Sequence, residues 1–232
     1  MPVLEHLVRD NIDKRVINRA ADFVRRDGII AMPTDTTWTA ACAFSSKAAV
    51  QKLRRISGER DERHFTLLCS KIAQFGGYCD IDTKRYRLIN KYMPGQYVFI
   101  LKTLHGTGKT LGLKRSELGV RVPDHPVPVA LINELDMPLY SITAKRSMLP
   151  VSNADNAGIE DDFNENEVLH EFEMPPIPEQ LLFECGYELL EIKNLGMILD
   201  TGEELARQFS TIVNLTGAEP YVIRKGAGDF PA

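Results

Sequence analysis

The sequence predicts a mixed α/β protein with an open sheet and flanking helices. Short apolar runs alternate along the chain with segments whose apolar residues recur at helical spacing. The chain has 232 residues, of which 44% are hydrophobic and 26% are charged. This is enough chain to bury a sizeable core in a single domain without support from disulfides or structural metals.

The first elements frame a polar loop. Residues 12–24 have apolar side chains at helical spacing, and Gly28 stands where the C-terminal cap of that helix belongs. Residues 29–32 then predict a short buried strand that runs into residues 33–37, a loop dense in hydroxyl side chains. In α/β folds, a polar loop that leaves a buried strand is a common place for a ligand.

The same patterns predict the remaining elements. Helices are expected at residues 46–56, from Asp82 onward, and at 127–135. Strands are expected at residues 65–69, 97–101, 118–122, 139–142, 197–199, 211–215 and 221–223. A stretch at about 147–195 is acidic and broken by prolines, and we expect it to be a surface excursion of the same single domain, residues 1–232.

Charge is divided unevenly along the chain. Residues 1–146 carry 24 Lys and Arg and 15 Asp and Glu, whereas residues 147–232 carry 4 and 17. A basic first part suits phosphates or nucleic acid, although helix faces that differ in sign by chance would give the same division. No apolar run approaches the roughly 18 residues of a membrane helix, and the charged N-terminus is unlike a signal peptide, so we expect a cytoplasmic protein with no membrane partner.

Several local motifs carry little chemistry. Residues 106–110 resemble a phosphate loop but lack its first glycine, because position 103 is Thr103. The four cysteines have spacings typical of neither zinc sites nor disulfide frameworks, and His64 and His125 have no obvious partner, so we expect no metal held by protein side chains. Asp35, the one acid of the hydroxyl loop, would orient a magnesium-bound nucleotide or, more simply, cap a turn.

A set of motifs in fixed order resembles the YrdC-like family. The motifs are PTDTTW at 33–38, MPGQY at 93–97, VRVPDHP at 120–126, PLYSITA at 138–144, and FSTIVN at 209–214 followed by Arg224-Lys225-Gly226. HFTLLC at 64–69 and the segment 210–229 are closest to the YciO branch of that family. The resemblance runs from about residue 28 to residue 229, with a gap over 147–195.

The resemblance implies a twisted open mixed sheet with flanking helices and a large basic cavity, with binding of a nucleotide or double-stranded RNA. The best-known members are cytosolic L-threonylcarbamoyladenylate synthases, nucleotidyltransferases that join threonine, bicarbonate and ATP for the modification of adenosine 37 of tRNA. By the same resemblance, Thr34, Thr36, Arg121, Ser141 and Ser210 contact the amino-acid substrate. Thr143 and Arg224 contact the nucleotide, which is ATP with Mg²⁺ in the synthases.

The chain departs from the family pattern where a synthase holds the triphosphate. Ser57 stands in place of a lysine and Glu59 in place of an arginine, while Lys145 replaces an asparagine. Two cations are lost and one anion is gained, which opposes triphosphate binding. Arg60, Arg63 and Lys145, together with neighbouring arginines, would rebuild a basic pocket that suits another nucleotide or an RNA end.

Three functions remain open at this point. The first is a YciO-like protein that binds a nucleotide or a double-stranded RNA or tRNA element, with weak synthase-type activity. The second is an authentic threonylcarbamoyladenylate synthase, which Ser57 and Glu59 disfavour. The third is a double-stranded-RNA-binding module without catalysis, which the basic first part of the chain favours and the acidic remainder opposes.

Overall fold

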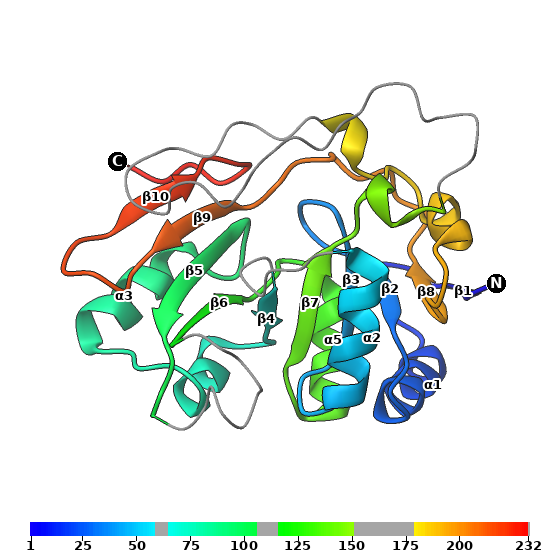
Figure 1. Ribbon diagram of the computed structural model, residues 1–232, viewed down its shortest axis with the longest axis horizontal. Helices are drawn as coiled ribbons and strands as arrows, with labels where there is room; N and C mark the ends of the chain where they lie inside the picture. The colour runs from blue at the N-terminus through cyan, green and yellow to red at the C-terminus, as the bar shows by residue number, and fades with distance from the viewer. Residues whose placement is uncertain (59–64, 106–115, 151–178, 232) are drawn as a thin grey trace.

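A computed structural model describes residues 1–58, 65–105, 116–150 and 179–231. Within these residues, ten strands form one sheet in the order β1-β8-β2-β3-β7-β4-β6-β5-β9-β10 (Figure 1). The strands are β1 (Val3–His6), β2 (Ile30–Pro33), β3 (Trp38–Ala43), β4 (Thr66–Leu68), β5 (Tyr97–Lys102), β6 (Glu117–Arg121), β7 (Leu139–Thr143), β8 (Met197–Asp200), β9 (Thr211–Asn214) and β10 (Tyr221–Arg224). The sheet is mixed, since β4 and β6 are parallel, as are β5 and β9, whereas β3 and β7 are antiparallel.

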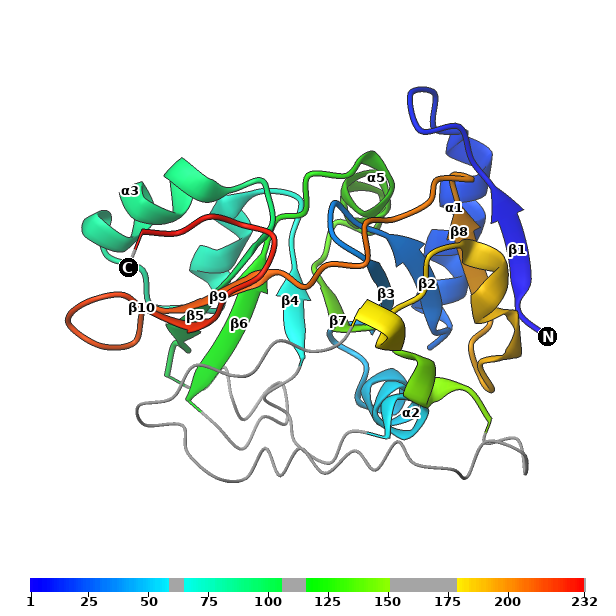
Figure 2. The ribbon, with the colours of Figure 1, turned by 90° about the horizontal axis from the view of Figure 1, so that it is seen from above.

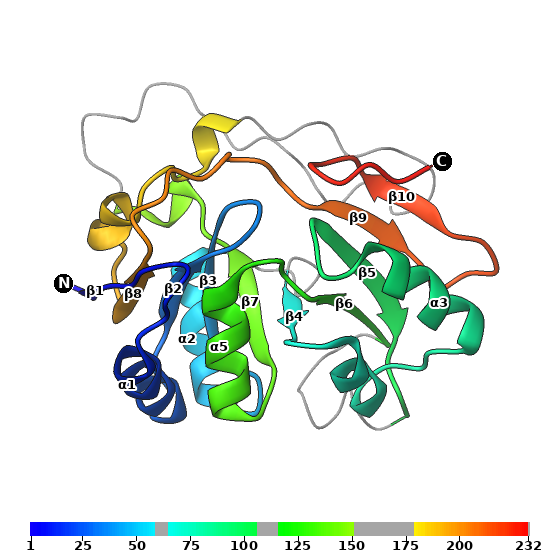
Figure 3. The ribbon, with the colours of Figure 1, turned by 180° about the vertical axis from the view of Figure 1, so that it is seen from behind.

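Helices cover both faces of this sheet. The α-helices are α1 (Lys14–Arg25), α2 (Lys47–Ser57), α3 (Thr83–Tyr92) and α5 (Pro126–Leu135), and the 3-10 helices are η2 (Ile72–Gly77), η3 (Arg146–Met148), η4 (Glu179–Leu181) and η5 (Gly186–Glu191). Seen from above, α2 lies on one side of the strands and α1, α3 and α5 lie on the other (Figure 2). The view from behind places α1 and α5 over the half of the sheet that contains β2, β3 and β7 (Figure 3).

The helices begin where the sequence patterns expect them. Asp13, Ser46 and Asp82 each accept a backbone N–H of the first turn that would otherwise have no partner. At the end of α1, the residue in the left-handed region is Asp27, with φ of 61°, and not Gly28. Gly28 is required for space instead, because a Cβ there would lie 2.2 Å from the ring of Phe23.

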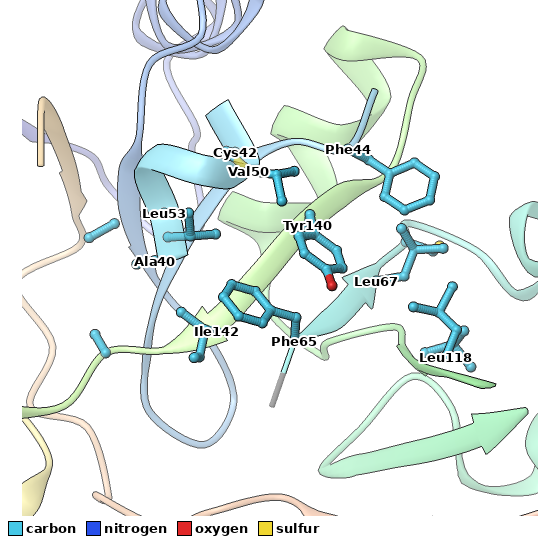
Figure 4. Close-up of a cluster of buried hydrophobic side chains, with 14 of the residues drawn as sticks. Ala40, Cys42, Phe44, Val50, Leu53, Phe65, Leu67, Leu118, Tyr140 and Ile142 are labelled. Carbon is cyan, nitrogen blue, oxygen red and sulfur yellow. The ribbon is translucent and has the colours of Figure 1, made fainter. Parts of the chain in front are cut away.

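Two hydrophobic clusters fill the space between the sheet and the helices. One contains the buried face of α2, the other the buried faces of α1 and α5. In the first, the rings of Phe65 and Tyr140 stack with centroids 4.9 Å apart and planes 8° apart (Figure 4). Because both rings are almost fully buried, they fix the position of β4 against β7.

Each strand expected from the sequence is present, with ends that differ from the expected ones by one or two residues. The structure has two further strands, β1 and β3, that the sequence patterns do not predict. All six residues of β3, WTAACA, are buried, because the strand lies in the interior of the sheet with helices on both faces. A strand that is buried on both faces shows no alternation of apolar and polar residues, so the sequence pattern does not reveal it.

The expected surface excursion at 147–195 is too long at its C-terminal end. Residues 151–178 lie outside the described residues, as do 59–64 and 106–115. By contrast, Phe183 and Leu189 are fully buried in the first hydrophobic cluster, and Glu184 O accepts a hydrogen bond from Trp38 Nε1 at 3.3 Å. This part of the acidic stretch therefore belongs to the core of the domain.

After β8 the chain crosses the upper edge of the sheet to reach β9, as both side views show (Figures 1 and 3). On the way, the backbone N–H of Gln208 donates to Thr36 O at 3.4 Å. The crossing segment thus runs over the turn that joins β2 to β3. Among the described helices, none is long and apolar enough to cross a membrane.

Candidate functional site

The turn between β2 and β3 is held by the hydroxyl of Thr34. Thr34 Oγ1 accepts the backbone N–H groups of Thr36 and Thr37, each at 3.2 Å, and donates to Thr37 O at 2.6 Å. Thr34 and Thr36 are both buried, and their hydroxyl oxygens lie 3.1 Å apart. The turn is therefore rigid, and its geometry does not depend on the carboxylate of Asp35.

That carboxylate forms a buried ion pair between the β2–β3 turn and the end of β6. Asp35 Oδ1 accepts from Arg121 Nη2 at 2.6 Å, and the two side chains are only 11% and 8% exposed. Arg121 is the last residue of β6, and its Nη1 donates to Ser210 Oγ at 2.6 Å. Burial lowers the pKa of Arg121 from its ordinary value, and the adjacent Asp35 acts in the opposite direction.

Three polar atoms of this cluster are buried and have no hydrogen-bond partner within the described part of the chain: Asp35 Oδ2, Arg121 Nε and Thr37 Oγ1. Buried polar groups are nearly always paired, since an unpaired one costs about 1–3 kcal/mol. An unpaired acceptor, an unpaired donor and an unpaired hydroxyl are therefore the features of this cluster that its own contacts do not explain.

Arg224, at the end of β10, reaches the same serine from another side. Its Nε and Nη2 donate to Ser210 O at 3.3 and 3.0 Å. Its guanidinium carbon lies 4.7 Å from the centroid of the Phe209 ring. Arg121 and Arg224 thus both contact Ser210, one through its hydroxyl and the other through its carbonyl.

The structure brings together five of the predicted site residues: Thr34, Thr36, Arg121, Ser210 and Arg224. Ser141 and Thr143 lie on β7, where Ser141 Oγ donates to Thr66 O at 3.0 Å and Thr143 pairs with Thr39 of β3. Lys145 follows β7 and forms a bridge with Leu182. These contacts place the three residues on and after β7, whereas Arg121 ends β6.

The predicted phosphate-binding positions are described only in part. Ser57 is the last residue of α2 and is buried, and its hydroxyl donates to Arg54 O at 3.0 Å. Glu59, Arg60 and Arg63 lie outside the described residues, as do His64 and the basic loop at 106–110. The large basic cavity therefore remains a prediction.

His125 caps α5. Its Nδ1 accepts the backbone N–H of Val127 at 3.3 Å, and its Nε2 lies 3.4 Å from Glu203 Oε2. Burial lowers the pKa of His125, and a lower pKa favours the neutral form of the ring. A cavity of about 610 Å³ opens beside it, between α3 and the start of α5, and its described lining contains none of the predicted substrate-binding residues. Both ring nitrogens are engaged in holding the fold together, so we assign His125 no chemical role.

Two contacts of the cluster are not predicted from the sequence, one made by Asp35 and one by Gln96. The sequence leaves two roles open for Asp35, a cap of its turn or a group that orients a magnesium-bound nucleotide. The first is wrong, because Thr34 Oγ1 holds the turn and the Asp35 carboxylate pairs with Arg121. The second stays a prediction. Gln96, which precedes β5, donates from Nε2 to Asp35 O at 3.0 Å. The only sequence signals for them are their places in the PTDTTW and MPGQY motifs.

The chain is similar to known proteins both in sequence and in structure. The family model Sua5_yciO_yrdC, described as "Telomere recombination", matches residues 22–173. The protein named "Uncharacterized protein YciO" of Escherichia coli (strain K12) is 32% identical over 221 residues, 95% of this chain and 93% of the relative. The threonylcarbamoyl-AMP synthase of Escherichia coli (strain K12) is 28% identical over 147 residues, 62% of this chain and 77% of the relative.

The crystal structure of E. coli YciO resembles this fold with a TM-score of 0.75 and 30% identity, covering 99% of this chain and 98% of that one. P. abyssi Sua5 complexed with L-threonine has a TM-score of 0.73 and 18% identity, covering 97% of this chain and 57% of that one. At 18% identity, this second likeness is evidence for the fold alone.

Proposed function

The chain belongs to the Sua5/YciO/YrdC family, and on that premise we propose that it binds an α-amino acid and a nucleotide around Arg121 and Arg224, with only weak adenylate-forming activity. One observation carries the proposal. The buried pair of Arg121 and Asp35 keeps a guanidinium N–H and a carboxylate oxygen without a partner among the described residues, and the hydroxyl of Thr37, two positions after Asp35, is also unpartnered there.

An α-amino acid is complementary to these three groups. Its carboxylate would accept from Arg121 Nε, and its ammonium would donate to Asp35 Oδ2. A hydroxylated side chain would pair with Thr37 Oγ1, which makes threonine the first amino acid to test. The name of the synthase relative supports this choice.

The nucleotide end is assigned to Arg224 and Phe209. A guanidinium that lies over an aromatic ring is fixed in direction and pairs well with phosphate oxygens. A bound ATP would bring Mg²⁺, which offsets part of the triphosphate charge. In family synthases a lysine and an arginine contact the triphosphate, and here those positions hold Ser57 and Glu59. We therefore expect slow turnover of ATP.

Arg224→Ala should weaken AMP binding by about 1.5–3 kcal/mol, the range for a hydrogen bond to a charged group. Isothermal titration calorimetry on both proteins measures the change. Arg85→Ala is the matched control, because Arg85 also donates to backbone carbonyls, Leu215 O and Gly217 O, but at the opposite end of β9. Equal losses in the two variants, or no loss in Arg224→Ala, would remove Arg224 from the site.

A specific feature of α2 keeps RNA as a second candidate ligand. This helix carries Lys47, Lys52, Arg54 and Arg55 and no acidic residue. Such a surface suits the sugar-phosphate backbone of double-stranded RNA, which proteins recognise mainly by shape.

If the protein binds RNA, the affinity should fall by at least about tenfold between 50 and 200 mM salt, because each phosphate contact releases a counterion. A mobility-shift series with a short RNA duplex measures this, and Lys47→Ala with Arg55→Ala should make the salt dependence shallower. Affinity that is independent of salt would contradict binding through the basic surface.

A further inference from the structure

The C-terminal tail, residues 225–231, is bound along the segment that leads into β9. Ala227 N–H donates to Phe209 O at 2.8 Å. Gly226 N–H donates to Thr211 Oγ1 at 2.9 Å, and Thr211 Oγ1 in turn donates to Gly228 O at 2.5 Å. A single hydroxyl group therefore holds both arms of the tail around Thr211.

At Gly226 and Gly228 the tail lies too close to its neighbours for any side chain. A Cβ at Gly226 would lie 2.2 Å from Phe209 O, and one at Gly228 would lie 2.5 Å from the Tyr97 ring. Beyond the glycines, Asp229 O accepts from Tyr97 OH at 2.8 Å, and the Phe230 ring packs 4.9 Å from that of Tyr92. The tail is thus anchored at two places, on Thr211 and on the aromatic cluster.

Thr211 is also connected to both partners of Arg121. It follows Ser210, whose hydroxyl accepts from Arg121. Its backbone N–H donates to Gln96 O at 3.0 Å, and Gln96 Nε2 donates to Asp35 O at 3.0 Å. A displacement of Thr211 would therefore be transmitted to the serine and to the aspartate that hold the guanidinium.

We propose that Thr211 is a positioning residue of the candidate site: its hydroxyl clamps the C-terminal tail onto β9 and so fixes Ser210 and Asp35 where Arg121 requires them. The consequence for ligands rests on the proposed function, whereas the consequence for Arg121 does not. The residue acts through its neighbours and need not touch a ligand.

The first test uses no ligand. Thr211→Val keeps the shape of the side chain but removes both hydroxyl bonds, whereas Thr211→Ser keeps them. In ¹⁵N NMR spectra, Thr211→Val should shift or broaden the Arg121 Nε–H signal and speed amide exchange at Gly226 by about tenfold, the equivalent of about one hydrogen bond. In Thr211→Ser, the Arg121 Nε–H signal and the amide exchange rate at Gly226 should stay as in the wild type.

Thr216→Val is the matched control, because Thr216 Oγ1 contacts Asn214 Oδ1 just beyond the opposite end of β9. It should leave the Arg121 signal unchanged. If Thr211→Val does not fold, Tyr97→Phe is the second variant, because it removes only the hydrogen bond from Tyr97 OH to Asp229 O. It should shift the Arg121 Nε–H signal in the same direction, but by less. An Arg121 signal that is unchanged in the folded variant would overturn the proposal.

The second test titrates L-threonine and AMP. If the wild-type protein binds them, Thr211→Val should raise the dissociation constants by about tenfold and Thr211→Ser by less than about twofold. Equal affinities for Thr211→Val and wild type would contradict the positioning role. If the wild type binds neither probe, the proposed function is wrong, and the NMR result alone decides the role of Thr211.

Discussion

Arg121→Met should lower the free energy of unfolding by about 3–5 kcal/mol. The variant leaves the Asp35 carboxylate buried, with its cationic partner removed. It also removes the donor to Ser210 Oγ. Urea denaturation, with the midpoint and slope compared between the two proteins, measures the change.

A more exposed ion pair provides the control. Arg19 makes two hydrogen bonds to Glu5, and the two side chains are 54% and 19% exposed. Arg19→Met should therefore cost less than about 1 kcal/mol. A loss below about 1 kcal/mol for Arg121→Met would contradict the assignment of a buried, mutually dependent pair.

Removing both charges should recover most of the stability. In Arg121→Met with Asp35→Ala no charge is left buried, and pairs of this kind can be replaced by apolar residues at little cost. The turn should survive, because Thr34 and not Asp35 holds it. This double variant separates the part that the pair plays in folding from the part that it plays in ligand binding.

Ser57→Lys together with Glu59→Arg should raise diphosphate release from ATP, in the presence of threonine and bicarbonate, by about 100-fold or more. Each restored cation is expected to contribute about 1.5–3 kcal/mol through a charge-assisted contact with the triphosphate. The two must be changed together, because neighbouring charges on one ligand do not act additively. Ser57 is buried at the end of α2, so the new lysine must extend past Gly58 to reach solvent.

The control makes the same change in charge elsewhere. Gln51→Lys with Glu219→Arg alters exposed residues on α2 and beyond β9 and should leave diphosphate release unchanged. Wild-type protein that already makes threonylcarbamoyladenylate at rates ordinary for a synthase would contradict the lost-contact argument. It would show that other cationic side chains contact the triphosphate in place of the lost lysine and arginine.

Local patterns in the sequence predict most of the fold because they report local physics. The spacing of apolar residues predicts α1, and Ser46 and Asp82 mark where α2 and α3 begin. β3 escapes this reasoning because both of its faces are buried, so its residues do not alternate between apolar and polar. β1 escapes it because Val3–His6 is a short edge strand whose residues are half-buried or exposed.

The candidate site is predictable only where a motif supplies the information. The order of the family motifs correctly groups Arg121, Ser210 and Arg224, although 89 positions separate Arg121 from Ser210. The role of Asp35 is different. In a polar turn an aspartate is read as a cap, and nothing near it in the sequence indicates a partner 86 positions away. Only the folded sheet brings β6 to that turn and makes the aspartate part of the site.

The most direct test of the amino-acid and nucleotide site is a calorimetric titration of L-threonine, with AMP present, into the wild-type protein and into Arg121→Met with Asp35→Ala. Thermal melting first establishes that the double variant is folded. We predict that the wild type binds L-threonine and that the folded double variant does not. Binding of equal strength in both proteins, or no binding to the wild type, would contradict the account.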